Sequence, residues 1–275
     1  GKPVVYTFYS TVFLIAAFLA IPFGAAIPDG IDLWVAILSG MTFGAAMWAM
    51  FAAVKASEAS HIDPFIGAVI TIATYIFSTI FLGEHLTELQ FVGVFVLAAA
   101  SFLLSFEKSK NHNGFHSGFL WGMLAGVLFA ISHVCAKYVY DNYPFLTAIV
   151  WARGSGGLFG LALLFVPSVW RSVMRRRTNG DEPKTYGKRH VIIIVAANKI
   201  LSVVAIVLAN YAIAIGSVTL VNALAGAQYV FMFFMIYFLT KFFPKIFQEY
   251  FTKREFFVET IAIALIVVGS VLFVV

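Results

Sequence analysis

Long apolar stretches alternate with short polar breaks along the whole chain. A helix needs about 20 residues to cross the roughly 30 Å apolar core of a bilayer, and the chain offers about nine stretches of that kind. They are apolar on all sides rather than alternating with a period of two, so they predict membrane helices and not the strands of a β-barrel. The predicted spans cover residues 3–26, 33–54, 64–83, 89–106, 117–138, 144–170, 191–215, 218–240 and 256–275, and Asp63-Pro64 predicts the start of the third.

The composition strengthens this prediction. Of the 275 residues 61% are hydrophobic and only 11% are charged, whereas soluble domains carry roughly 25% charged residues. The net charge of +5 comes from cations that lie between the apolar stretches, so it indicates membrane topology rather than a nucleic-acid partner. Cys135 is the single cysteine, which excludes an intramolecular disulfide and a cysteine-based metal cluster.

The positive charges gather in every second connection between the predicted spans, and the other connections hold almost none apart from Lys137. The positive-inside rule places cation-rich connections in the cytoplasm. The chain would therefore start inside and, after an odd number of spans, end outside. The cations that share this parity are Lys2, Lys55, Lys108, Lys110, Arg171, Arg175, Arg176, Arg177, Lys184, Lys188, Arg189, Lys241, Lys245, Lys253 and Arg254.

A self-comparison of the chain indicates two related halves. The span that opens at Pro3 matches the one that opens at Pro144, and residues 88–104 match residues 257–273. Nothing in the first half pairs with residues 117–138, so we expect that an equivalent helix precedes Gly1 in the native protein. The prediction is an all-α polytopic membrane protein with two inverted repeats of a five-helix unit. The repeats would be residues 1–106, lacking their first helix, and residues 117–275, joined by a linker at 107–116.

Several short motifs carry a resemblance to a known family. In the first half they are residues 51–57, the turn from Gly83-Glu84 to Thr87, and Gln90-x-x-Gly93; in the second half, residues 130–137, 151–153 and 210–214 fit the same pattern. The chain resembles the EamA-type transporters of the drug/metabolite transporter superfamily. The resemblance implies a ten-helix carrier of two inverted five-helix repeats, of which this chain would lack the first helix. Members of that family usually have both termini in the cytoplasm, whereas the cation count would put both ends of a ten-helix version outside.

Two cations are predicted at the depth of the bilayer centre. At about 1.5 Å of rise per residue, Arg153 lies about 14 Å into its span and Lys199 about 14 Å into its own, and no Asp or Glu lies as deep. Burying such charges is costly, so one interpretation is that both line a wet cavity and attract a carboxylate or a phosphate. The other is that each binds helix-end carbonyls or water in a structural role.

Other polar residues in the spans have two interpretations as well. Asn198 and Gln228 offer amides that must find a neighbouring helix or a substrate, and Tyr75 and Trp48 are predicted to line the opposite side of the site or to pack. His133 is a hypothetical proton relay, with a hydrogen-bonded packing role as the alternative. Glycines spaced four apart, as in Gly40-x-x-x-Gly44, predict close helix packing.

These residues predict a secondary active transporter of a small anionic or zwitterionic metabolite, such as an amino acid or organic acid, by alternating access across the cytoplasmic membrane. One alternative is proton-coupled efflux of cationic or drug-like compounds, and another is a lipid-handling or structural membrane subunit. No enzyme activity, metal or cofactor is predicted, because no paired acids, ligand cluster or activated nucleophile is evident. The expected partners are a small metabolite and the lipid bilayer, with a homodimer left open and no nucleic acid.

Overall fold

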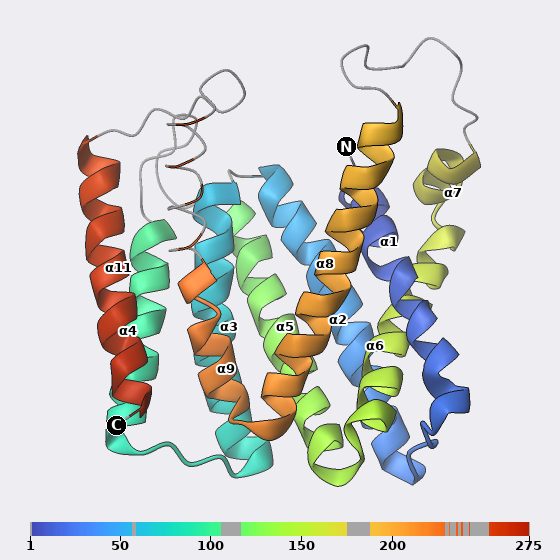
Figure 1. The fold of residues 1–275 in the computed structure, drawn as a ribbon, viewed down its shortest axis with the longest axis horizontal. Helices are drawn as coiled ribbons and strands as arrows, with labels where there is room; N and C mark the ends of the chain where they lie inside the picture. Colours follow the sequence, from blue (N-terminus) through green and yellow to red (C-terminus); the bar gives the residue numbers. More distant parts are fainter. Residues whose placement is uncertain are drawn as a thin grey trace.

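A computed structural model describes residues 2–56, 59–105, 117–174, 188–228 and 253–274, together with Phe231, Met235, Phe238 and Phe242. Within these residues every regular element is a helix, and most of the helices run up and down side by side (Figure 1). The helices are α1 (Pro3–Thr11), η1 (Val12–Phe23), α2 (Gly30–Ala56), α3 (Ala59–Leu82), α4 (Glu88–Ser105), α5 (Ser117–Asn142), α6 (Phe145–Ala162), η2 (Leu163–Phe165), α7 (Pro167–Met174), α8 (Lys188–Ile215), α9 (Val218–Leu224) and α11 (Lys253–Val274).

Six of the helical segments are long and apolar enough to cross a membrane, which confirms the predicted class of all-α membrane protein. They are Pro3–Phe23, Gly30–Ala56, Ile62–Leu82, Ser117–Asn142, Phe145–Phe165 and Ala197–Ile215. Two shorter apolar helical segments cover Glu88–Leu103 and Thr260–Leu272. Most of the predicted span at 218–240 and the whole predicted linker at 107–116 lie outside the described residues, so the total of about nine spans stays a prediction.

Two boundaries differ from the sequence-based expectation, and proline explains both. Helix α3 begins at Ala59, so Pro64 lies inside it rather than at its start; a proline at this position lacks the N–H that would bond the carbonyl four residues before it. The predicted span 144–170 is interrupted, because α6 ends at Ala162 and α7 begins at Pro167. Val166 between them is extended, with ψ 121°, which is the conformation favoured before a proline.

Helix α5 lies in the middle of the bundle and packs against α2 and α3, while α6 packs against α2 and η1. Glycines make the contacts with α6 close. A Cβ on Gly40 would lie 2.1 Å from Ser155 Oγ, and a Cβ on Gly157 would lie 2.1 Å from the backbone nitrogen of Ile15. The structure therefore confirms that these small residues serve helix packing.

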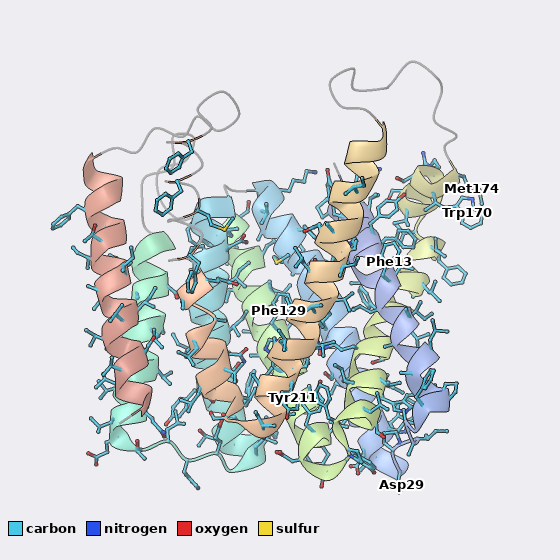
Figure 2. The ribbon with its side chains drawn as sticks, in the orientation of Figure 1. Phe13, Asp29, Phe129, Trp170, Met174 and Tyr211 are labelled. Atoms are coloured by element: carbon cyan, nitrogen blue, oxygen red, sulfur yellow. The ribbon has the colours of Figure 1, made fainter. Side chains whose placement is uncertain are left out.

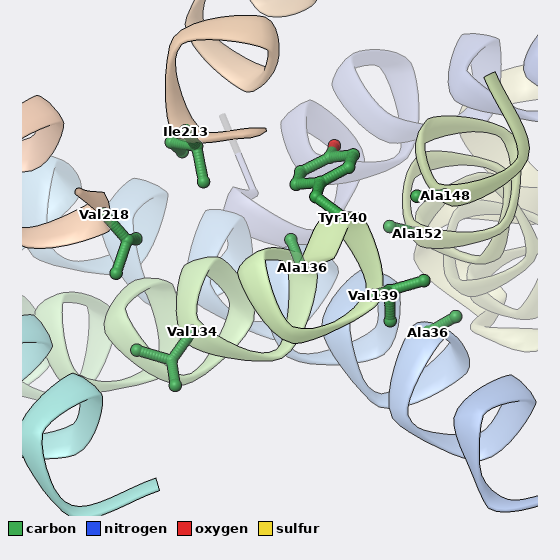
Figure 3. Close-up of a cluster of buried hydrophobic side chains, with 9 residues drawn as sticks. All are labelled: Ala36, Val134, Ala136, Val139, Tyr140, Ala148, Ala152, Ile213 and Val218. Carbon is green, nitrogen blue, oxygen red and sulfur yellow. The ribbon is translucent and has the colours of Figure 1, made fainter. Parts of the chain in front are cut away.

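A cluster of buried apolar side chains joins α2, α5, α6, α8 and α9 (Figure 3). It fixes the C-terminal part of α8 to α5 through Ile213, whereas the nine consecutive residues 197–205 of α8 are all exposed. A helix packed along one side hides residues three or four apart, so the described residues leave the middle of α8 largely exposed. The members of the cluster are Ala36, Val134, Ala136, Val139, Tyr140, Ala148, Ala152, Ile213 and Val218.

Most of the described charges at the two ends of the bundle are separated by sign, although Asp63 near the start of α3 lies at the cationic end and Lys137 near the acidic one. The end where α1 begins holds Lys2, the last turn of α2 with Lys55, and Arg171 of α7 (Figure 1). The other end is mostly acidic, and its carboxylates are Asp29, Asp32, Glu84, Glu88 and Asp141. Among the described side chains, Lys2, Lys55 and Arg171 thus share one end, as the positions of the cations along the sequence predict.

Candidate functional site

The hairpin of α5 and α6 brings Arg153 and His133 to the same depth. Arg153 lies eight residues after Phe145, the first residue of α6, and His133 lies nine residues before Asn142, the last residue of α5. At about 1.5 Å per residue these offsets put the two side chains about 12 and 13.5 Å from the turn that joins the helices. A cation and an imidazole therefore lie at a similar depth inside the bundle, far from either end.

Arg153 is only 4% exposed, and its direct partners are neutral. Its Nε and Nη2 atoms donate to Oδ1 of Asn210 on α8, at 3.0 and 2.5 Å. The Tyr140 hydroxyl donates to the same oxygen at 2.8 Å. The guanidinium lies over the ring of Phe43, with its central carbon 4.7 Å from the ring centroid, which is a cation–π contact.

One nitrogen of this guanidinium, Nη1, is buried and has no hydrogen-bond partner among the described residues. No described carboxylate forms an ion pair with Arg153 either. Buried polar groups are normally hydrogen-bonded and buried charges are normally paired. The site therefore holds one positive charge and two free N–H donors on Nη1.

His133 lies beside Asn222 of α9 and within electrostatic reach of Arg153. The Asn222 amide nitrogen donates to Thr74 Oγ1 at 3.0 Å, which links α9 to α3. The imidazole Nδ1 atom is buried without a partner, although part of the His133 side chain stays accessible, as does part of Phe43. Accessible surface on the central helix at this depth is what a binding site needs.

Two aromatic rings, Phe43 and Phe129, connect Arg153 to His133 through side-chain contacts. The Phe43 ring under the guanidinium meets Phe129 edge-on at 5.6 Å between centroids, and Phe129 lies 6.3 Å from the His133 ring. Figure 2 shows Phe129 near the middle of the bundle. Arg153 and His133 therefore each contact an aromatic side chain, from α2 and α5 respectively.

Lys199, the second predicted cation, lies elsewhere. It is exposed, its Nζ donates to the Tyr9 carbonyl at 3.5 Å, and it lies 5.2 Å from the Phe13 ring on η1. Phe13 stands toward the α1 side of the bundle, away from Phe129 (Figure 2). Lys199 precedes Asn210 by 11 residues (210 − 199) on α8, which is about 16 Å of helix, so the structure does not bring the two cations together.

The other predicted lining residues also lie apart from Arg153. Asn198 is exposed, and its carbonyl accepts from Ser202. Gln228 is exposed at the end of its described segment. Tyr75 packs 5.4 Å from the ring of Phe91, and Trp48, which is 37% exposed, meets Trp121 at 5.6 Å.

Asn210 is the residue that the analysis of candidate side chains missed. The sequence pointed to it only as part of the segment 210–214 that carries the family resemblance, and not as a candidate site residue. In the structure its side-chain oxygen accepts three hydrogen bonds. Its signal was an amide inside an apolar span, since such an amide must find a partner. That signal does not distinguish Asn210 from Asn198, which is exposed on the same helix.

The turn that carries the family resemblance has a structural role in this chain. Gly83 ends α3 with φ +64°, a conformation that favours glycine. Thr87 and Gln90 cap α4 reciprocally, because each side chain accepts from the other residue's backbone N–H. Gly93 lets α4 approach α11, since a Cβ there would lie 3.0 Å from the Gly269 carbonyl.

Nothing in the described part of the chain gathers three or more His, Cys, Asp or Glu side chains into a group that could hold a metal ion. The groups at the site are instead hydrogen-bond donors and acceptors. They are able to bind a small polar molecule and to orient it against these aromatic rings.

Comparison with known proteins identifies the fold and no family. No family model matches the chain, and no curated protein matches it. A solved structure described only as "Crystal structure of protein" matches 100% of this chain and 89% of its own, with a TM-score of 0.66 and 15% sequence identity. At this identity the likeness shows a shared fold alone.

Proposed function

We propose that this membrane protein is a secondary active transporter of the EamA type, which moves a small anionic or zwitterionic metabolite by alternating access. The observation that carries the proposal is Arg153, a buried cation whose hydrogen-bond partners are neutral and whose Nη1 atom has none. An isolated charge costs at least a few kcal/mol at this depth. A bound anion would offset that cost each time the site is filled.

The sign of the charge favours an anion over a cationic solute. The described side chains that contact or face Arg153 and His133 include no carboxylate to receive a cation. An Arg guanidinium binds carboxylates well because its planar donors match their two oxygens. This is why efflux of cationic compounds fits the site less well than transport of an anion.

The arrangement of the helices supports two inverted repeats. The self-comparison of the sequence pairs α1 and η1 with α6, and α4 with α11, and the two members of each of these pairs lie in contact. Helices related by a pseudo-two-fold axis come together in this way when the axis runs between them. Transporters built from such repeats place their substrate at the interface of the repeats, near the centre of the membrane.

Hydrogen bonds between the two proposed repeats close the acidic end of the bundle. Thr219 of α9 bonds both Ser78 of α3, at 2.8 Å, and the Glu84 carboxylate, at 2.7 Å. The Trp151 indole donates to the Ala26 carbonyl at 2.8 Å. Contacts that join the two repeats at one end of the bundle fit one state of an alternating-access carrier.

The charge separation supports one orientation in the cytoplasmic membrane. Cations concentrate on the cytoplasmic side of membrane proteins, and Lys2, Lys55 and Arg171 lie at the end opposite the closed one. The acidic end, where Thr219 and Trp151 bond across the two proposed repeats, would then face outward.

A thermal-stability screen of the purified protein tests the proposal. The ligands are amino acids, organic acids, sugar phosphates and cationic dyes, each measured with the wild type, Arg153→Met and Arg171→Met. Arg171 is an exposed arginine of α7 and serves as the matched control. We expect anions to stabilise the wild type and Arg171→Met but not Arg153→Met. Stabilisation by cationic dyes alone, unchanged in Arg153→Met, would overturn the proposal.

A further inference from the structure

Hydrogen bonds on both sides of the Asn210 amide hold it in one orientation. The side chain is buried, and its nitrogen donates to the Ile206 carbonyl at 2.7 Å, one turn earlier on α8. Its oxygen accepts from Arg153 Nε and Nη2 on α6 and from the Tyr140 hydroxyl on α5. Since an amide donates only through nitrogen and accepts only through oxygen, both sets of bonds require the oxygen to face Arg153.

The Asn210 oxygen in turn fixes the guanidinium of Arg153. It holds the edge formed by Nε and Nη2, while the Phe43 ring lies against the guanidinium. The guanidinium is planar and rigid, so holding one edge also sets the direction of the third nitrogen, Nη1. That nitrogen is buried and has no hydrogen-bond partner among the described residues. Asn210 therefore orients a donor that it does not itself contact.

The acceptor on Arg153 is uncharged, which matters as much as its position. An aspartate has nearly the shape of an asparagine and would accept the same bonds, but its carboxylate would form an ion pair with Arg153 and cancel the positive charge. The amide oxygen accepts the bonds and leaves that charge in place. No carboxylate in the described part of the chain forms an ion pair with Arg153.

We propose that Asn210 determines the charge selectivity of the Arg153 site, as a positioning residue whose neutral amide holds the guanidinium and keeps its charge available to an anion. Asn210 acts through Arg153 and needs no contact with the ligand. This inference rests on the proposed transport function and deepens it, because it assigns to α8 the residue that decides whether an anion is attracted.

Two substitutions separate this role from a merely structural one. Asn210→Asp keeps an acceptor for Arg153 and Tyr140 but neutralises the guanidinium; it loses the bond to the Ile206 carbonyl, and the new ion pair offsets that loss. Asn210→Ala removes the acceptor and leaves the charge. A structural role alone predicts tighter anion binding by Asn210→Asp, which keeps the bonds. The proposed role predicts tighter binding by Asn210→Ala, because a carboxylate repels the ligand anion.

Calorimetric titration of the purified protein with propanoate, succinate and inorganic phosphate tests the inference. Asn210→Asp should lose about tenfold or more in affinity for the anions that the wild type binds, the ratio expected for one hydrogen bond to a charged group, and Asn210→Ala should lose less. Asn198→Asp is the matched control, because it adds the same charge at an exposed position of α8, and it should stay within about twofold of the wild type. Without ligand, Asn210→Asp should melt no lower than Asn210→Ala.

Binding by Asn210→Asp as tight as that of the wild type would overturn the inference, and so would tighter binding by Asn210→Asp than by Asn210→Ala. If Asn210→Asp melts below Asn210→Ala or does not fold, its carboxylate does not pair with Arg153, and the inference fails as well. In these cases anion binding by the wild type leaves the proposed transport function standing. If the wild type binds none of the three anions, the inference and the anion specificity of the proposed function fail together.

Discussion

Replacing Asn210 by leucine should be among the most destabilising single substitutions in this protein. The Asn210 Oδ1 atom accepts from Arg153 Nε and Nη2 and from the Tyr140 hydroxyl, at 3.0, 2.5 and 2.8 Å. Leucine has a similar volume and no acceptor, so Asn210→Leu leaves a buried guanidinium and a buried hydroxyl without their shared partner. Hydrogen bonds to a charged group contribute about 1.5–3 kcal/mol each, and breaking a buried charged pair costs about 3–5 kcal/mol. We therefore expect a loss of about 3 kcal/mol or more.

The assay is equilibrium unfolding in mixed detergent micelles. A double-mutant cycle of Asn210 and Arg153 isolates the interaction between these two side chains. Asn198→Leu is the matched control, because Asn198 is exposed on the same helix. Removing the charge as well, in Asn210→Leu with Arg153→Met, should recover at least half of the lost stability, since apolar replacement of a buried polar pair is often neutral. The claim that Asn210→Leu leaves Arg153 as an uncompensated charge is refuted by either of two results. One is that Asn210→Leu lowers the free energy of unfolding no more than Asn198→Leu does. The other is that the double variant is no more stable than Asn210→Leu.

Three further substitutions test the packing that surrounds the site. Gly157→Ala should lower the unfolding free energy by about 2 kcal/mol, because its Cβ would lie 2.1 Å from the Ile15 backbone nitrogen; a loss no larger than that of exposed Leu158→Ala in the same melt would contradict this. Thr87→Val should cost about 1 kcal/mol through loss of the α4 cap, and an unchanged melting curve would argue against the cap. Thr219→Val removes the bonds to Ser78 and Glu84, so deuterium exchange over residues 83–88 should rise several-fold; unaltered exchange would show that these bonds do not close that end.

The sequence was informative about helices because the apolar stretches and the residues that end them act locally. Gly83 and Thr87 mark the turn between α3 and α4 through backbone conformation and capping, which depend on a few neighbouring residues. The start of α3 was predicted wrongly at Pro64, because a proline favours the first helical position but α3 begins at Ala59, before the proline. The span predicted at 144–170 was continuous because its residues are apolar, but in the structure a new helix begins at Pro167.

Depth along a helix could be predicted, whereas the partner of each side chain could not. The distance of Arg153 from the α5–α6 turn follows from residue counting. Its bond to Asn210 depends on how α8 is rotated against α6, which is decided by contacts such as that of Ile213 in the shared apolar cluster. Residue counting placed Lys199 at a similar depth, but it cannot tell that α8 packs through its C-terminal part and leaves Lys199 exposed.

The most direct test of the central claim, that Arg153 binds a transported anion, is counterflow of a labelled organic acid into vesicles that contain the purified protein. The account predicts saturable uptake by the wild type, uptake of similar size by Arg171→Met, and loss of uptake by Arg153→Met when equal amounts of folded protein are present. Uptake by Arg153→Met at the rate of the wild type would show that this cation has only a structural role and would contradict the account.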